Sequence, residues 1–145
     1  GKQEEFDTKL AHGVVLKQQG KYEEALILYQ ECLEGFLLLH GENSTDVART
    51  YGNMASVYYI QGKYDKALEY YEKALKIRLE TLGADHPDVA TTYSGMAVLY
   101  YNQNKYKEAL SLFEKALQIR KSRLGNEHPK TVDVQKWVNR LRILK

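Results

Sequence analysis

The chain of 145 residues repeats itself every 42 residues. Residues 61–75, QGKYDKALEYYEKAL, return as QNKYKEALSLFEKAL at 103–117, and QGKYEEALILYQECL at 19–33 matches both. The same step separates Gly41, Gly83 and Gly125, and it separates two Leu-Gly-x-x-His-Pro segments, 82–87 and 124–129. A fixed period in this range is typical of stacked supersecondary units, each too small to bury its own apolar face.

Each unit has the pattern of two helices. In the second unit Tyr51, Met54, Ala55 and Tyr58 follow the spacing i, i+3, i+4, i+7 of one helix face, and a second apolar stripe follows Gly62. Glycine adopts positive φ without strain, so a turn is expected at Gly62 and at its counterparts. The pattern predicts helices near residues 5–18, 22–39, 46–60, 64–81, 88–102, 106–123 and 131–144.

The predicted fold class is all-α, an α-α superhelix of three helix pairs plus a C-terminal capping helix. We expect one domain, 1–145, with repeats at about 4–45, 46–87 and 88–129 and the capping helix at about 130–145. The apolar stripe of the cap consists of Val134, Trp137, Val138, Leu141 and Leu144. Such a helix closes the last pair of a repeat array.

The residues at these slots resemble the tetratricopeptide repeat (TPR) family. The second unit supplies Tyr51, Met54, Ala55, Tyr58, Gly62, Tyr64, Ala67, Tyr71 and Ala74, and the third supplies their counterparts at +42, with Asn104 for the glycine and Phe113 for one tyrosine. The first unit departs from the pattern on its first helix, where the slots hold Lys9, His12, Gly13 and Leu16. The period of 42 and the Leu-Gly-x-x-His-Pro connector resemble the kinesin light chain type of repeat.

The resemblance implies a TPR solenoid whose concave groove holds a peptide segment of a partner protein. Tyr59 and Tyr101 each follow a core tyrosine by one residue, which turns them toward that side. The candidate peptide-binding residues are Leu10, Val14, Lys17, Arg49, Asn53, Ser56, Tyr59, Ser94, Val98, Tyr101, Lys136 and Arg140. Leu10 and Val14 stand where chaperone-binding repeats carry the Lys and Asn of a carboxylate clamp, which disfavours that kind of ligand.

Other classes of function find little support in the residues. No nucleophile–base set, phosphate loop or clustered carboxylate pair is present, so we expect no enzyme and no cofactor. No two of the four histidines have the i, i+4 spacing of metal ligands. His12 is expected in the core, His40 near a helix end, and Cys32 in a small-residue core slot. The tyrosines are expected in the core, the sequence pI of about 8.5 is low for nucleic-acid binding, and no apolar run is long enough for a membrane span.

Charge is distributed unevenly along the chain. Residues 1–45 hold four Lys and eight Asp or Glu, a net of −4, whereas residues 118–145 hold eight Lys or Arg and two acids, a net of +6. We therefore expect a protein or peptide partner with acidic residues and an apolar anchor. The alternative is a homo-oligomer joined head to tail, with Lys136, Arg140 and Arg142 facing Glu4, Glu5 and Asp7 of another copy. The single cysteine favours a reducing, cytoplasmic location.

Overall fold

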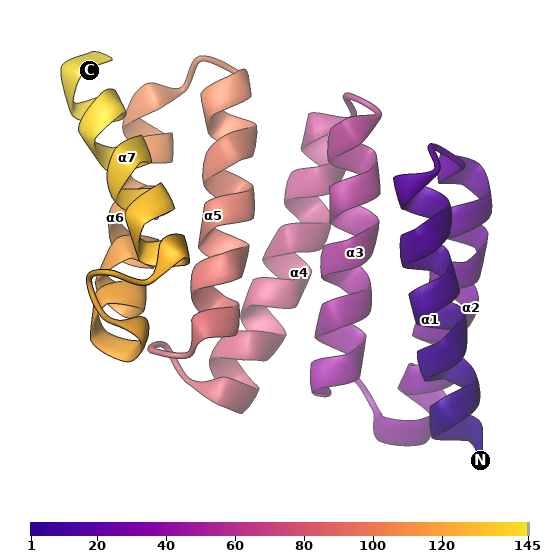
Figure 1. Ribbon diagram of the computed structural model, residues 1–145. Helices are drawn as coiled ribbons and strands as arrows, with labels where there is room; N and C mark the ends of the chain where they lie inside the picture. Colours follow the sequence, from indigo (N-terminus) through magenta and orange to yellow (C-terminus); the bar gives the residue numbers. More distant parts are fainter. Residues whose placement is uncertain (145) are drawn as a thin grey trace. The chain divides into compact units, whose positions relative to one another are not determined.

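A computed structural model describes residues 1–144, which form seven α-helices and no strand (Figure 1). The helices are α1 (Lys2–Gln18), α2 (Tyr22–His40), α3 (Thr45–Ile60), α4 (Tyr64–Leu82), α5 (Pro87–Asn102), α6 (Tyr106–Leu124) and α7 (Pro129–Leu144). The seven predicted helices are confirmed, each with its ends within three residues of the prediction. Lys145, the last residue of the predicted domain and cap, lies outside the described residues.

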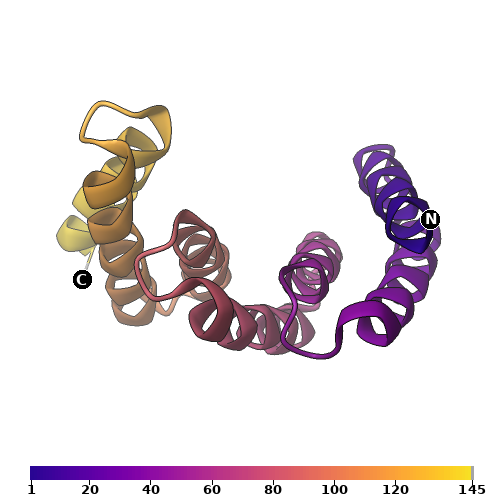
Figure 2. The same ribbon diagram turned by 90° about the horizontal axis from the view of Figure 1, so that it is seen from below.

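The chain divides into two compact units, Gly1–Thr81 and the part from Leu82 onward. In the first unit α1 and α3 form one layer and α2 and α4 the other (Figures 1 and 2). In the second unit α5 and α6 form an antiparallel pair, and α7 packs on α6 beside α5 (Figure 1). The three helix pairs and the capping helix are thus confirmed, while the single domain and the repeat boundaries remain predictions.

The connectors have the backbone that the repeated glycines predict. Gly62 has φ +77°, and Asn104, which replaces glycine in the third repeat, has φ +62°. Asparagine is among the few residues with a side chain that enter this region at modest cost. Gly83 and Gly125 also have positive φ, and each follows the end of a long helix.

One connector slot caps the helix that follows it, before α3, α5 and α7. Ser44 Oγ accepts hydrogen bonds from the N–H groups of Asp46 and Val47, at 3.1 and 3.5 Å. The residues 42 and 84 positions later are histidines whose Nδ1 does the same: His86 accepts from the Asp88 N–H at 3.0 Å, and His128 from the Lys130 N–H at 3.1 Å. His86 has an extended backbone, with ψ 140°, as is usual for a residue before proline, and this places its side chain to cap α5.

Small residues bring the two helices of each pair close together. The alanines at the predicted slots are fully buried: Ala25, Ala55, Ala67, Ala74, Ala97, Ala109 and Ala116. Cys32 is buried in the slot of Ala74 and Ala116, as predicted, and its thiol donates to the Phe6 carbonyl oxygen at 3.5 Å. Burial raises the pKa of the Cys32 thiol to about 11. A thiol held protonated is a poor nucleophile.

The core side of α1 differs from the prediction. His12 is exposed, and Leu10, expected at the groove, is only 5% exposed. The reason is that two aromatic rings pack directly against glycines between α1 and α2. A Cβ added to Gly13 would lie 2.6 Å from Cε1 of Tyr29. A Cβ added to Gly35 would lie 2.3 Å from Cζ of Phe6. These contacts turn Leu10, Gly13 and Leu16 inward and leave His12 outside.

Most tyrosines at repeat slots are less buried than expected. Tyr58 is buried, but six others at the predicted core slots are half-buried: Tyr51, Tyr64, Tyr71, Tyr93, Tyr100 and Tyr106. Tyr51 and Tyr58 both meet Tyr70 edge to face, with centroids 5.8 and 5.3 Å apart. Lysine ammonium groups lie over these rings, Lys66 at 5.0 Å from Tyr58 and Lys73 at 5.0 Å from Tyr70. Lysine side chains therefore cover the exposed parts of these rings.

Candidate functional site

The first-unit face is the surface of α1 and α3 formed by seven predicted site residues: Leu10, Val14, Lys17, Arg49, Asn53, Ser56 and Tyr59. Two side-chain contacts join the helices across this face. Lys17 Nζ donates to Ser56 Oγ at 3.3 Å, and Arg49 Nη2 lies 3.3 Å from Asp7 Oδ1. Arg49 also pairs with Asp46 at 3.0 Å. The structure therefore brings these residues together, but internal partners already occupy Arg49.

The remaining side chains of the first-unit face offer little open surface. Leu10 belongs to the core, while Val14, Asn53 and Tyr59 are half-buried. Partial burial lowers the pKa of Lys17. The Tyr59 ring lies beside Tyr64, with centroids 5.9 Å apart. Most side chains of the first-unit face are therefore buried or already in contact with other residues of the chain.

The second-unit face is the surface of α5 and α7 formed by the other five predicted residues: Ser94, Val98, Tyr101, Lys136 and Arg140. The contact that joins it is aromatic, because Tyr101 meets Trp137 edge to face at 4.9 Å. Trp137 also stacks on Phe113 at 5.0 Å with an interplanar angle of 11°. The Arg140 guanidinium lies 5.5 Å from the Trp137 ring centroid. Trp137 is thus held by all three helices of the unit and remains half-buried.

A pocket of about 300 Å³ lies on this face, lined by Asp133, Lys136, Trp137 and Arg140. The two cations are exposed, and no ion pair within residues 1–144 involves either of them. Trp137 was expected on the apolar stripe of the cap. Its place in the pocket lining could have been inferred from its position at the edge of that stripe, next to Lys136.

The second unit also buries polar groups, among them Arg120 and the hydroxyl oxygens of Ser94 and Thr131. Arg120 of α6 is 8% exposed, and within residues 1–144 it forms no hydrogen bond or ion pair. Burial lowers the pKa of Arg120, and the charge of Asp133 partly offsets this. Ser94 Oγ is buried without a hydrogen-bond partner among the described residues. Arg120 was missed at the sequence level, because an arginine in an amphipathic helix is usually exposed.

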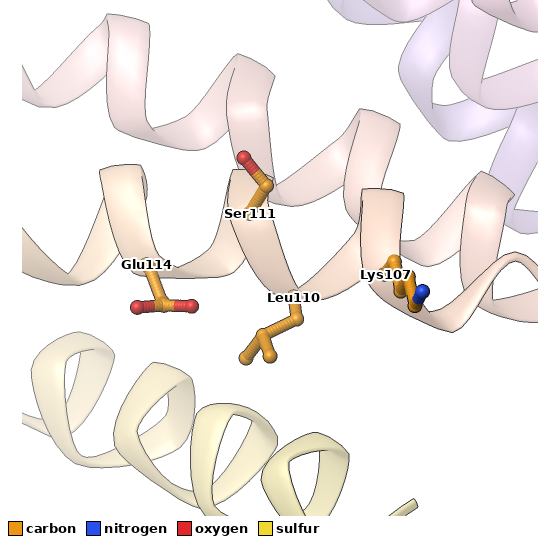
Figure 3. Close-up of a pocket in the computed structure, with 4 residues that line it drawn as sticks. All are labelled: Lys107, Leu110, Ser111 and Glu114. Atoms are coloured by element: carbon orange, nitrogen blue, oxygen red, sulfur yellow. The ribbon is translucent and has the colours of Figure 1, made fainter. Parts of the chain in front are cut away.

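The opposite side of the second unit has a different character. Lys107, Leu110, Ser111 and Glu114 of α6 line a second pocket there, with Leu110 pointing toward α7 (Figure 3). Arg142 of α7 pairs with Glu114 at 3.8 Å. This pocket has one cation, one anion and no aromatic ring, so it offers a peptide less than the second-unit face does.

The described residues contain no group of three His, Cys, Asp or Glu side chains that could hold a metal ion. Within the same residues, no helix is both long enough and apolar enough to cross a membrane. The second-unit face presents a half-buried aromatic ring, Trp137, next to two exposed cations, Lys136 and Arg140.

The family model described as tetratricopeptide repeat matches residues 4–80 and 46–122. No curated protein sequence matches the chain. Among solved structures, BtubC (BKLC) from P. vanneervenii is 23% identical with a TM-score of 0.86, over 95% of this chain and 55% of BtubC. TPR-like repeats assigned to a kinesin light chain of Podosopora anserina are 21% identical with a TM-score of 0.83, over 94% of this chain and 65% of theirs.

A third similar structure is the TPR2B domain of yeast Sti1 in complex with pHsp70, at 14% identity and a TM-score of 0.72, over 97% of this chain and 98% of that domain. At these identities the likeness establishes the fold. The chain spans 55% and 65% of the two kinesin light chain-related structures. The chain belongs to the tetratricopeptide repeat family, and its fold is similar to that of the TPR-like repeats assigned to a kinesin light chain.

Proposed function

We propose that this chain is a non-enzymatic protein-interaction module and that its second-unit face binds an acidic peptide segment with an apolar anchor. The observation that carries the proposal is the half-buried Trp137 ring flanked by Lys136 and Arg140. A domain of the same fold, TPR2B of yeast Sti1, is in complex with pHsp70, which supports a protein-derived ligand here by analogy. The proposed location is the cytoplasm.

The chemistry of the pocket suggests how each part of a ligand would be bound. An apolar anchor would lie against Trp137 and Tyr101, where it replaces water at an aromatic surface. A carboxylate next to the anchor would meet Lys136 or Arg140. Exposed charges of this kind accelerate encounter and contribute modest affinity. We therefore expect micromolar binding, about 8 kcal/mol, that weakens as salt is added.

The residues of the first-unit face play a smaller part in this proposal. Arg49 would have to leave Asp7 and Asp46 before it could bind a ligand carboxylate. Breaking two existing ion pairs for one new pair offers little net free energy. Val14 and Asn53, both half-buried, could make weaker contacts with a longer segment.

The test is binding of a fluorescently labelled acidic peptide with a Leu anchor, measured by anisotropy. Reversing two charges, Lys136→Glu with Arg140→Glu, should weaken binding at least tenfold and leave the circular dichroism spectrum unchanged. The matched control is Lys121→Glu with Lys130→Glu, the same change in net charge at two exposed residues outside the pocket. Equal affinity in both double variants would contradict the assignment of the pocket.

Trp137 offers a second readout in the unaltered protein, because it is the only tryptophan in the chain. Its emission should change saturably with the acidic peptide and not with a basic peptide of matched length. An unchanged emission at saturating anisotropy would place the ligand elsewhere on the chain.

A second candidate function is self-association, which the division of charge between the two ends of the chain favours. Two of the acids first expected at such a contact already have partners on their own helix or on α3. Glu5 pairs with Lys2 at 3.3 Å, and Asp7 pairs with Arg49 at 3.3 Å. If copies associate, another acidic surface is better suited.

A further inference from the structure

The outer side of α2 exposes large apolar side chains. Ile27 is 61% exposed and Leu38 is 90% exposed. They are 11 residues apart, three helical turns or about 16 Å, and so lie on one face. Glu31 and Glu34 occupy the same face between them. We call these four residues the α2 strip: Ile27, Glu31, Glu34 and Leu38.

The other repeats show that these apolar residues are specific to α2. Forty-two residues later, α4 has Glu69 and Glu80 at the two outer positions, and α6 has Ser111 and Ser122. All four of these residues are exposed. The strip therefore lies on a side that faces solvent in every repeat, rather than on a side where repeats stack. Exposed apolar pairs on such a side indicate an interaction surface.

A complementary strip lies on α7. Val132 is 37% exposed and Ile143 is 83% exposed, and they too are 11 residues apart. Lys136 follows Val132 by four residues, as Glu31 follows Ile27, and Arg140 lies beside the same face. We call this the α7 strip: Val132, Lys136, Arg140 and Ile143. The two strips have the same apolar spacing and opposite charge.

We propose that the α2 strip of one copy docks on the α7 strip of a second copy, with the two helices antiparallel. This inference rests on the self-association put forward above as the second candidate. In the antiparallel arrangement Ile27 meets Ile143 and Leu38 meets Val132. Glu34 then lies opposite Lys136, and Glu31 lies next to Arg140. A parallel arrangement would form an equivalent set, with Glu31 opposite Lys136 and Glu34 next to Arg140. The antiparallel arrangement is preferred because it opposes the two helix dipoles.

The present partners of these charges permit the exchange. Glu31 lies 3.5 Å from Lys9, which it shares with Glu5. Among the described residues, Glu34 accepts a hydrogen bond only from the Gln30 amide, at 3.4 Å. Lys136 has no ion pair within residues 1–144, and Arg140 lies over Trp137. Docking therefore breaks no strong contact of either strip.

The contact between the α2 strip and the α7 strip determines what kind of assembly can form. The two strips are different surfaces, so a pair of copies keeps the α7 strip of one copy and the α2 strip of the other free. Such a heterologous contact adds copies in series unless the rotation closes a ring. One helix against one helix is a small interface, so the association should be weak, dependent on concentration and sensitive to salt.

The first experiment measures mass by sedimentation velocity over a range of concentrations at low salt. The mass of the unaltered chain should rise with concentration, and the rise should shrink in high salt. Ile27→Glu with Leu38→Glu, which copies the residues of α4, should weaken association at least tenfold. The matched control, Glu69→Lys with Glu80→Lys on α4, should associate as the unaltered chain does.

The second experiment exchanges the charges. Glu31→Lys with Glu34→Lys should abolish association, and so should Lys136→Glu with Arg140→Glu. Mixing these two variants should restore it, because the basic α2 strip of one then meets the acidic α7 strip of the other. Circular dichroism of each variant checks the fold.

The outcomes separate the proposals. A constant monomer mass at every concentration would overturn both this contact and self-association. Association that survives Ile27→Glu with Leu38→Glu, or a mixture that stays monomeric, would overturn the contact alone. The peptide proposal is assayed separately, since Glu31→Lys with Glu34→Lys leaves the pocket lining of the second-unit face unchanged.

Discussion

The first and third helix pairs fill the same repeat slots with different chemistry. Between α1 and α2 the slots hold Gly13, Tyr29 and Cys32, and between α5 and α6 they hold Ala97, Phe113 and Ala116. All six residues are buried. The third pair has an apolar core, whereas the first encloses a hydroxyl and a thiol. A repeat can therefore keep its backbone while its interior changes character.

The comparison of these two pairs shows that residues in contacting slots differ together between repeats. Gly13 lies against the Tyr29 ring, and the alanine of the other pairs would be too large there. The Tyr29 hydroxyl is buried with no hydrogen-bond partner among the described residues. Burial, and then the neighbouring Cys32, raise the pKa of Tyr29 to about 12. Three predictions test this comparison.

The largest effect is expected from Gly13→Ala, which gives the first pair the alanine of the third. A Cβ 2.6 Å from Cε1 of Tyr29 forces the ring or α1 to move, and overpacking of this kind costs about 2–3 kcal/mol. Urea unfolding followed by circular dichroism measures the loss. The control is Gly52→Ala, whose Cβ would meet only Arg78 Nη1 at 4.0 Å. It should be neutral or stabilise by about 0.5–1 kcal/mol through helix propensity.

A medium effect is expected at alkaline pH. The folded pKa of Cys32 is about 11 against 9.0 for the ordinary thiol, so the folded state holds the proton longer than the unfolded state. That contribution is complete below pH 9 and is lost as the pH rises toward 11, on the order of 1–2 kcal/mol. Tyr29 adds a loss between pH 10 and 12. In Cys32→Ala, the residue of the third pair, the decline should begin near pH 10.

Lys17 opposes this trend, because its pKa is lowered by burial and its contribution to stability rises with pH. Urea unfolding at steps from pH 7 to 11 measures the sum. If Cys32→Ala and the unaltered chain decline from the same pH, the thiol is not the group responsible.

The smallest effect is expected from Tyr29→Phe, which copies Phe113. Removing a buried hydroxyl without a partner should stabilise the chain by about 1 kcal/mol at neutral pH. The reverse change, Phe113→Tyr, should destabilise it, because Phe113 is 1% exposed and stacks on Trp137. Thermal melts of both variants decide the sign, and a loss of stability in Tyr29→Phe would mean that the hydroxyl has a partner.

The repeat period made the helices and turns predictable. Gly62, Asn104 and Pro87 each have a backbone requirement that depends on local chemistry, so their places could be inferred without tertiary contacts. The capping histidines were missed, although His86 and His128 stand 42 and 84 residues after Ser44, a common capping residue. Comparing slots across repeats would have found them.

The candidate site was harder to predict. The polar first half of α1 is compatible with more than one inward face, and only the rings of Phe6 and Tyr29 decide that Leu10 is buried and His12 exposed. Arg49 pairs with Asp7, 42 positions earlier, and the spacing of residues within one helix cannot predict such a contact. The four residues that line the pocket beside Trp137 follow the spacing i, i+3, i+4, i+7 along α7 and could be grouped from the sequence, whereas the contacts of Trp137 with Tyr101 and Phe113 could not.

The capped connector also bears on how such a chain could lengthen. The joints before α5 and α7 have the same six-residue pattern, with His86 and His128 capping the helix that follows. A duplicated segment 88–129 would therefore begin after one capping histidine and end with the next. Gene duplication could therefore insert a whole helix pair at this joint without requiring a new turn sequence. The number of repeats could then change while every connector keeps the same pattern.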